Sequence, residues 1–123
     1  MSFKKIAYTN EMEILVTPKN LVCFTGTLLS AGVVADTDGK KYVMAGSFID
    51  ATGAVVAETG TAGSETLTTE PVGVLYRTVE VTNGDEACSL VVEGYLRADR
   101  VLAGFADAAV VLLKAALTEI KFR

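Results

Sequence analysis

The stretch from Pro71 to Leu102 constrains the fold of this chain more than any other part of the sequence. It holds two runs rich in β-branched, aromatic and aliphatic residues, which favour a pleated and half-buried surface. The two runs are joined by Asn83-Gly84-Asp85, a combination typical of a turn. The stretch therefore predicts a pair of strands that ends in a corner at Gly94–Leu102, and it indicates a scaffold, because nothing in it can perform acid-base chemistry at neutral pH.

Two further hairpins are predicted upstream. Asp36-Thr37-Asp38-Gly39 contains an Asp-Gly pair between apolar runs, which is a strong hairpin signal. Asp50-Ala51-Thr52-Gly53 ends in a glycine that can adopt the positive φ of such a turn. The flanking runs that we expect to form strands are, in chain order, Gly32–Ala35, Lys41–Met44, Ser47–Ile49 and Ala54–Ala57.

One helix is predicted, from Asp107 to Thr118, in a segment rich in Ala and Leu. At 100° per residue, Asp107, Lys114 and Thr118 form a narrow polar stripe on an otherwise apolar cylinder. Such a helix cannot turn all of its apolar residues toward one small sheet, so we expect one side to pack on its own domain and another to contact a neighbouring subunit. The candidate interface residues are Val110, Val111, Leu112, Leu113 and Leu117.

The chain divides into an N-terminal arm over residues 1–20 and a single β-rich domain over residues 21–123. The arm ends at the turn signal Pro18-Lys19-Asn20. Between the strands, Glu58–Glu70 holds one large apolar residue, Leu67, and is expected to be a mobile surface loop. The predicted fold class is mainly β with one C-terminal α-helix.

The composition favours a protein with an interface. Hydrophobic residues make up 50% of the chain and charged residues only 21%, so part of the apolar surface needs a partner. The formal net charge is -4 and no long run of Lys or Arg occurs, which argues against direct contact with nucleic acid. No signal-peptide pattern and no run long enough to span a bilayer is present, so we expect a protein made in the cytoplasm with no membrane partner.

The residue types needed for common catalytic sites are missing. The chain has no histidine, which removes the commonest general base and metal ligand. The paired carboxylates, such as Asp36 and Asp38, lie in turn-like places where they normally face water. Cys23 and Cys88 are too few for a zinc site and are expected to be small buried residues. We therefore expect no catalytic residues, no metal site and no cofactor.

Three short segments carry a resemblance to a known family. They are Lys41-Tyr42-Val43, Pro71-Val72-Gly73-Val74-Leu75, and Leu90–Gly94 leading into Tyr95–Leu102. Together they resemble the head decoration proteins of tailed bacteriophages, of the lambda type, over about residues 40 to 104. The first forty residues match less well, and the predicted helix has only loose parallels there.

The resemblance implies a small decoration-protein fold, like a β-barrel or β-sandwich with an N-terminal arm. It further implies a homotrimer, without enzymatic activity, on the outer surface of the virion at three-fold positions, where it binds the major capsid protein and stabilises the expanded head. The arm is expected to dock on the capsid through Phe3, Ile6, Tyr8 and Ile14. Alternatives are a head-fibre or other virion structural protein, a small β-domain that binds a ligand or regulatory partner, and an enzyme.

Overall fold

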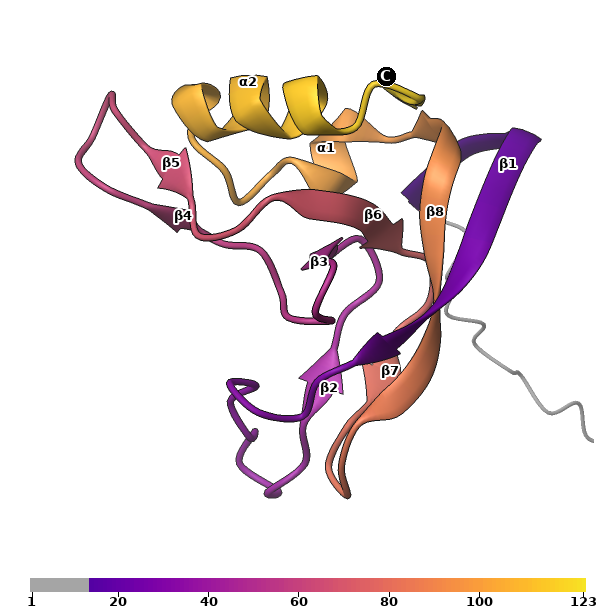
Figure 1. The fold of residues 1–123 in the computed structure, drawn as a ribbon, viewed down its shortest axis with the longest axis vertical. Coiled ribbons are helices and arrows are strands. Elements are labelled where there is room, and N and C mark those ends of the chain that lie inside the picture. The colour runs from indigo at the N-terminus through magenta and orange to yellow at the C-terminus, as the bar shows by residue number, and fades with distance from the viewer. Residues whose placement is uncertain (1–13) are drawn as a thin grey trace, which may run out of the picture.

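The computed structural model of the protein describes residues 14–123 and is mainly β, with two helices and open sheets (Figure 1). The strands are β1 (Leu15–Leu28), β2 (Tyr42–Val43), β3 (Phe48–Asp50), β4 (Glu58–Thr59), β5 (Thr66–Leu67), β6 (Pro71–Leu75), β7 (Val79–Glu80), β8 (Glu86–Leu96) and β9 (Ile120–Phe122). The helices are α1 (Ala98–Val101) and α2 (Asp107–Ala116).

Strand β8 lies at the centre of the main sheet, whose order is β1-β8-β6-β3. β1 and β6 pair with β8 in antiparallel fashion, and β9 pairs with its last residues in parallel. In the register of β6 and β8, Val74 is opposite Val91 and Leu75 is opposite Leu90. The predicted pairing of the two runs around Asn83-Gly84-Asp85 is therefore confirmed.

The main sheet is apolar on both faces. Adjacent residues alternate between two separate buried clusters, because successive side chains of a strand point to opposite faces. Val74, Val91 and Phe48 belong to the cluster that packs under α2, while Leu75, Leu90 and Ile49 belong to the other. Each face of this one sheet thus needs its own cover: α2 with β9 on one side, and the segments around β2 and β7 on the other (Figure 1).

Of the two predicted hairpins, the second forms in part: its first run is β3 and its turn closes, but Ala54–Ala57 contributes only an isolated bridge at Val55 and no strand. Asp50–Gly53 closes a tight turn in which Gly53 has φ 96°, and Ile49 pairs with Val55 across it. Asp36–Gly39 also makes a turn, but the run before it is not a strand, and β2 after it pairs with β7 instead. The prediction of the first hairpin is thus wrong for the run Gly32–Ala35 and for the pairing, while β2 lies within the predicted run Lys41–Met44; the local turn signal does not reveal a partner about forty residues away.

β1 crosses the boundary that the sequence suggested at residue 20. It continues through Pro18 because β1 is an edge strand, where proline removes no ladder hydrogen bond. Asn20 takes a positive φ of 60° at an irregularity of the register. Cys23, predicted to be buried, is exposed, because the edge strand has no cover there; Cys88 is buried as expected.

The segment Glu58–Glu70 is more ordered than its composition suggested. It forms the two-stranded sheet β4–β5, with Glu58 opposite Leu67 and Thr59 opposite Thr66. The threonines suit paired strands, and Leu67 packs against the large core cluster. Within residues 14–123, no helix is long and apolar enough to cross a membrane.

Candidate functional site

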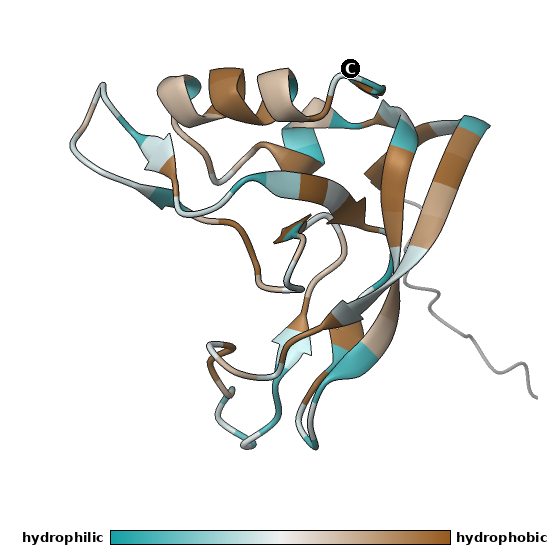
Figure 2. Cartoon of the chain, in the orientation of Figure 1, coloured by the Kyte–Doolittle hydropathy of each residue, from teal (hydrophilic) through white to brown (hydrophobic). Residues whose placement is uncertain are grey.

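Helix α2 presents two faces of different character. Ala109 and Leu113 are fully buried on the inner face, and the C-cap residue Leu117 is buried with them. On the outer face Val111 is 66% exposed and Leu112 is 40% exposed. Figure 2 shows the apolar colouring continuing around the middle of the helix. The helix therefore leaves two large apolar side chains, Val111 and Leu112, uncovered by the described part of the chain.

The β4–β5 hairpin is attached to the beginning of this helix. The Glu58 carboxylate accepts a hydrogen bond of 2.9 Å from the backbone N–H of Ala106, the residue that caps α2. Negative charge is favourable at that end of a helix. At the base of the hairpin, the Thr68 N–H donates to the Ala57 carbonyl at 2.8 Å, and the Ala57 N–H donates to the Thr68 hydroxyl at 3.1 Å. The Glu58 bond links the hairpin to the helix, and the two bonds between Ala57 and Thr68 close the base of the hairpin.

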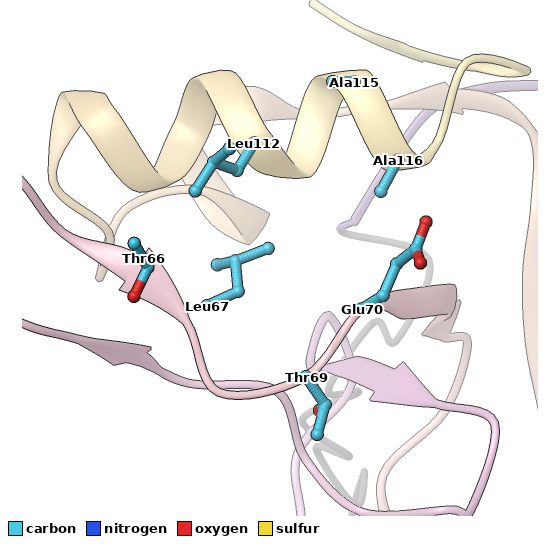
Figure 3. Close-up of a pocket in the computed structure, with 7 residues that line it drawn as sticks. All are labelled: Thr66, Leu67, Thr69, Glu70, Leu112, Ala115 and Ala116. Atoms are coloured by element: carbon cyan, nitrogen blue, oxygen red, sulfur yellow. The ribbon is translucent and has the colours of Figure 1, made fainter.

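A groove of about 450 Å³ lies between α2 and the chain that leaves β5 (Figure 3). In Figure 3, Leu112 and Leu67 point toward each other across it, and the Glu70 side chain is directed toward Ala116. Its lining is mostly apolar, with a single carboxylate. The lining residues are Thr66, Leu67, Thr69, Glu70, Leu112, Ala115 and Ala116.

The hairpin side of the groove carries only negative charge. From Tyr42 to Tyr76 the sequence contains four acidic residues and no Lys or Arg. Three of the four, Glu58, Glu65 and Glu70, belong to the hairpin and its continuation into β6. An apolar groove with an acidic rim suits a partner that offers apolar side chains next to basic ones.

The five helix residues predicted as an interface do not share one surface. Leu113 and Leu117 lie in the core, so we correct their assignment, and Val110 is partly buried against the same cluster. Only Val111 and Leu112 remain open to a partner. The polar stripe of Asp107, Lys114 and Thr118 is exposed, in agreement with the helical spacing.

The groove wall opposite α2 is not apparent from the sequence. The one sequence feature that could indicate this wall is Leu67, the single large apolar residue of a polar segment. Composition alone places that residue in a mobile loop, because the contact of β5 with α2 joins segments distant in the chain.

The predicted capsid-binding residues fall in two places. Phe3, Ile6 and Tyr8 lie outside the described residues. Ile14 is buried, 6% exposed, in the large core cluster, and its carbonyl accepts a 2.7 Å hydrogen bond from the Arg97 N–H. Ile14 therefore belongs to the core of the chain's own domain, which corrects its assignment to a docking arm.

The most perturbed carboxylate, Asp50, is held by its own turn. Burial by itself raises the pKa of Asp50, but four hydrogen bonds outweigh it and hold the pKa at about 2. Oδ1 accepts bonds from the Thr52 hydroxyl (2.6 Å), the Thr52 N–H (2.9 Å) and the Ala54 N–H (3.0 Å), and Oδ2 accepts one from the Thr69 hydroxyl (2.7 Å). Because all four bonds come from the turn itself and from Thr69, this carboxylate has a structural role.

In the described part of the chain, the remaining reactive side chains do not converge on a site. Desolvation raises the pKa of the buried Cys88 thiol and also that of Cys23, although Cys23 is exposed on the edge strand, so neither cysteine is an activated nucleophile. Among residues 14–123 no group of three Cys, Asp or Glu side chains is placed to hold a metal ion. No family model matches the chain, and no curated protein or solved structure matches it.

Proposed function

We propose that this chain is a virion structural protein of a tailed bacteriophage. It binds the outer surface of the expanded head and stabilises the shell as a homotrimer at three-fold positions. Its partners are other copies of itself and the major capsid protein, and it is made in the cytoplasm of the bacterial host. The finer fold belongs to the same proposal: a small β-barrel or β-sandwich of the decoration-protein kind with an N-terminal arm.

The observation that supports the proposal most is the pair of uncovered apolar side chains on α2. Leu112 lines the groove together with Leu67, and Val111 is 66% exposed on the outer face of the same helix. Exposed apolar patches with polar rims commonly mark protein interfaces. A shell-stabilising protein acts by binding energy summed over many contacts, which matches a chain whose prominent surface feature is such a patch.

The test is binding to purified, expanded heads of the virus that encodes the chain. We expect co-sedimentation that saturates at a fixed ratio of this protein to the major capsid protein, and a higher temperature of head disruption when the sites are filled. Heads that take up none of the protein at micromolar concentration would contradict the proposal.

Substitutions in α2 test the interface assignment. Val111→Asp and Leu112→Asp place a charge on the outer face of the helix, so these variants are expected to stay folded by circular dichroism yet lose self-association or head binding. Leu113→Asp is the matched control, since a charge at that buried position costs several kcal/mol and unfolds the domain. If Val111→Asp and Leu112→Asp associate and bind heads like the wild type, α2 is not the interface.

The groove also favours a second candidate, a β-domain that binds a small ligand. A volume of about 450 Å³ lies within the usual range for ligand pockets, and its walls are mostly apolar. This function would be favoured over the first if the chain bound a small hydrophobic cation saturably, lost that binding in Leu112→Asp, and did not bind heads.

A further inference from the structure

Among residues 14–123, no strand pairs with the outer edge of β1. This strand is the terminal one in the order β1-β8-β6-β3, and β8 is its partner on the other side. The free edge of such a strand presents backbone N–H and C=O groups that can pair with another strand.

The two halves of this edge differ in how they are protected. The first half contains Pro18, Lys19 and register shifts that continue as far as the step from Val22 to Cys23, which are the usual devices that prevent edge pairing. From Cys23 to Leu28 the register with β8 is regular, without proline or charge. The second half is therefore suited to accept a strand.

The turn at Asp50–Gly53 limits the open stretch at its far end. The Leu29 N–H donates to the Gly53 carbonyl at 3.1 Å, and the backbone of Gly53 lies against the Thr27 carbonyl. The open stretch thus runs from Val22, which borders the last register shift, to Gly26. Phe24, at its midpoint, is 64% exposed.

We propose that Val22–Gly26 pairs in antiparallel fashion with the same segment of a second copy of this chain. The occupant must be extended, uncharged and apolar, and the sequence supplies such a segment in β1 itself: residues 21–35 contain no charged side chain. Two-fold pairing about the midpoint stacks Phe24 on its counterpart and places Cys23 opposite Thr25 of the other copy. No charge is buried in either copy.

A cavity lies beside this edge. About 260 Å³ of space lies on the face that carries Phe24, bounded by Val72, Leu90 and Val92. Phe24 and Asp50 also line this cavity, so it adjoins the proposed contact and is not filled by the stacked rings. This contact is distinct from α2, so it can join two subunits or two trimers, and it does not depend on capsid binding.

Cysteine cross-linking of the full chain tests the register. In Thr25→Cys, mild oxidation is expected to give a covalent dimer rapidly, because the new thiol of one copy lies directly opposite Cys23 of the other, within disulfide reach. Val16→Cys, in the protected half, is the matched control and should cross-link at least about tenfold more slowly. Equal rates at the two positions, or no covalent dimer from Thr25→Cys at about 100 µM protein, would overturn the proposal.

Sedimentation tests whether the contact exists without a cross-link. Phe24→Lys is expected to halve the particle mass of the wild type, and Val16→Lys, a comparably exposed apolar position on the same strand, to leave it unchanged. Both variants should retain the wild-type circular dichroism spectrum, since both side chains face solvent. An unchanged particle mass in Phe24→Lys would also overturn the proposal, and any strand that pairs here would then belong to a different protein. Loss of head binding with an unchanged particle mass bears on the proposed function instead.

Discussion

Two turns in this chain have the same outline and very different roles. Asp36–Gly39 and Asp50–Gly53 both begin with Asp and end with a glycine of positive φ, and in both the Asp Oδ1 accepts backbone N–H bonds from the turn and the residue after it. The first turn is exposed and Gly39 has open space around it, whereas the second is packed against β1. The same local motif thus specifies a turn in both places, and tertiary packing decides how much stability depends on it.

The largest expected difference is at the two glycines. In Gly53→Ala, the added Cβ overlaps the Thr27 carbonyl oxygen and the residue keeps a strained positive φ, so we expect a loss of at least about 4 kcal/mol in the free energy of unfolding. Gly39→Ala meets no neighbouring atom and should lose only about 1 kcal/mol from the backbone strain. Urea titrations of the two variants measure this difference. Equal losses would mean that the Asp50–Gly53 turn is not anchored on β1.

The next largest difference in the free energy of unfolding is expected between substitutions of the two aspartates, Asp50 and Asp36. Asp50→Ala leaves two backbone N–H groups and two hydroxyls without their acceptor, so a loss of about 3 kcal/mol is expected. Asp36→Ala exposes its freed N–H groups to water and should lose less than about 1 kcal/mol. Thermal unfolding of both variants checks the order, and a more severe effect at Asp36 would reverse the comparison.

Because Asp50 is charged in the folded protein, its contribution to the free energy of unfolding depends on pH. Its pKa lies at about 2 in the folded protein, below the ordinary value of 3.8, so ionised Asp50 stabilises the fold above about pH 4 and this stabilisation is lost as the pH falls toward 2. The advantage of the wild type over Asp50→Asn is therefore expected to shrink by about 2 kcal/mol between pH 5 and pH 2. Urea titrations at both pH values measure it; an advantage that does not change with pH would show that the carboxylate is not ionised in the fold.

The smallest expected effect concerns the link from this turn to the groove. Thr69 lines the groove and donates its hydroxyl to Asp50 Oδ2 at 2.7 Å. Thr69→Val removes one hydrogen bond to a charged acceptor and should cost about 1.5 kcal/mol. Thr66→Val, on the same groove wall, is the control and should stay within about 0.5 kcal/mol of the wild type. Calorimetry of the two variants distinguishes them, and equal stability would show that the Thr69 bond contributes nothing.

The sequence predicts local features of this fold better than distant ones. The turn at Asn83-Gly84-Asp85, the pairing across it and the turn of the second hairpin follow from residues close together in the chain. The pairing of β2 with β7, the continuation of β1 through Pro18 and the exposure of Cys23 do not, because each depends on where a strand lies in the sheet. For α2 the helical spacing identifies the polar stripe but does not tell which apolar side is covered, since Leu67 approaches it from another segment.

The central position of β8 has a consequence for how the chain folds. Its partners β1 and β6 precede it, and β9 follows it across α1 and α2, so most of the sheet is built from contacts between segments far apart in the chain. Closing such long loops is slow compared with forming helices and hairpins. During synthesis β1 emerges about sixty residues before the strand that it pairs with, and its uncharged second half remains unpaired until then. A chaperone that binds extended apolar segments is therefore expected to engage the nascent chain at β1, and to release it once β8 has left the ribosome.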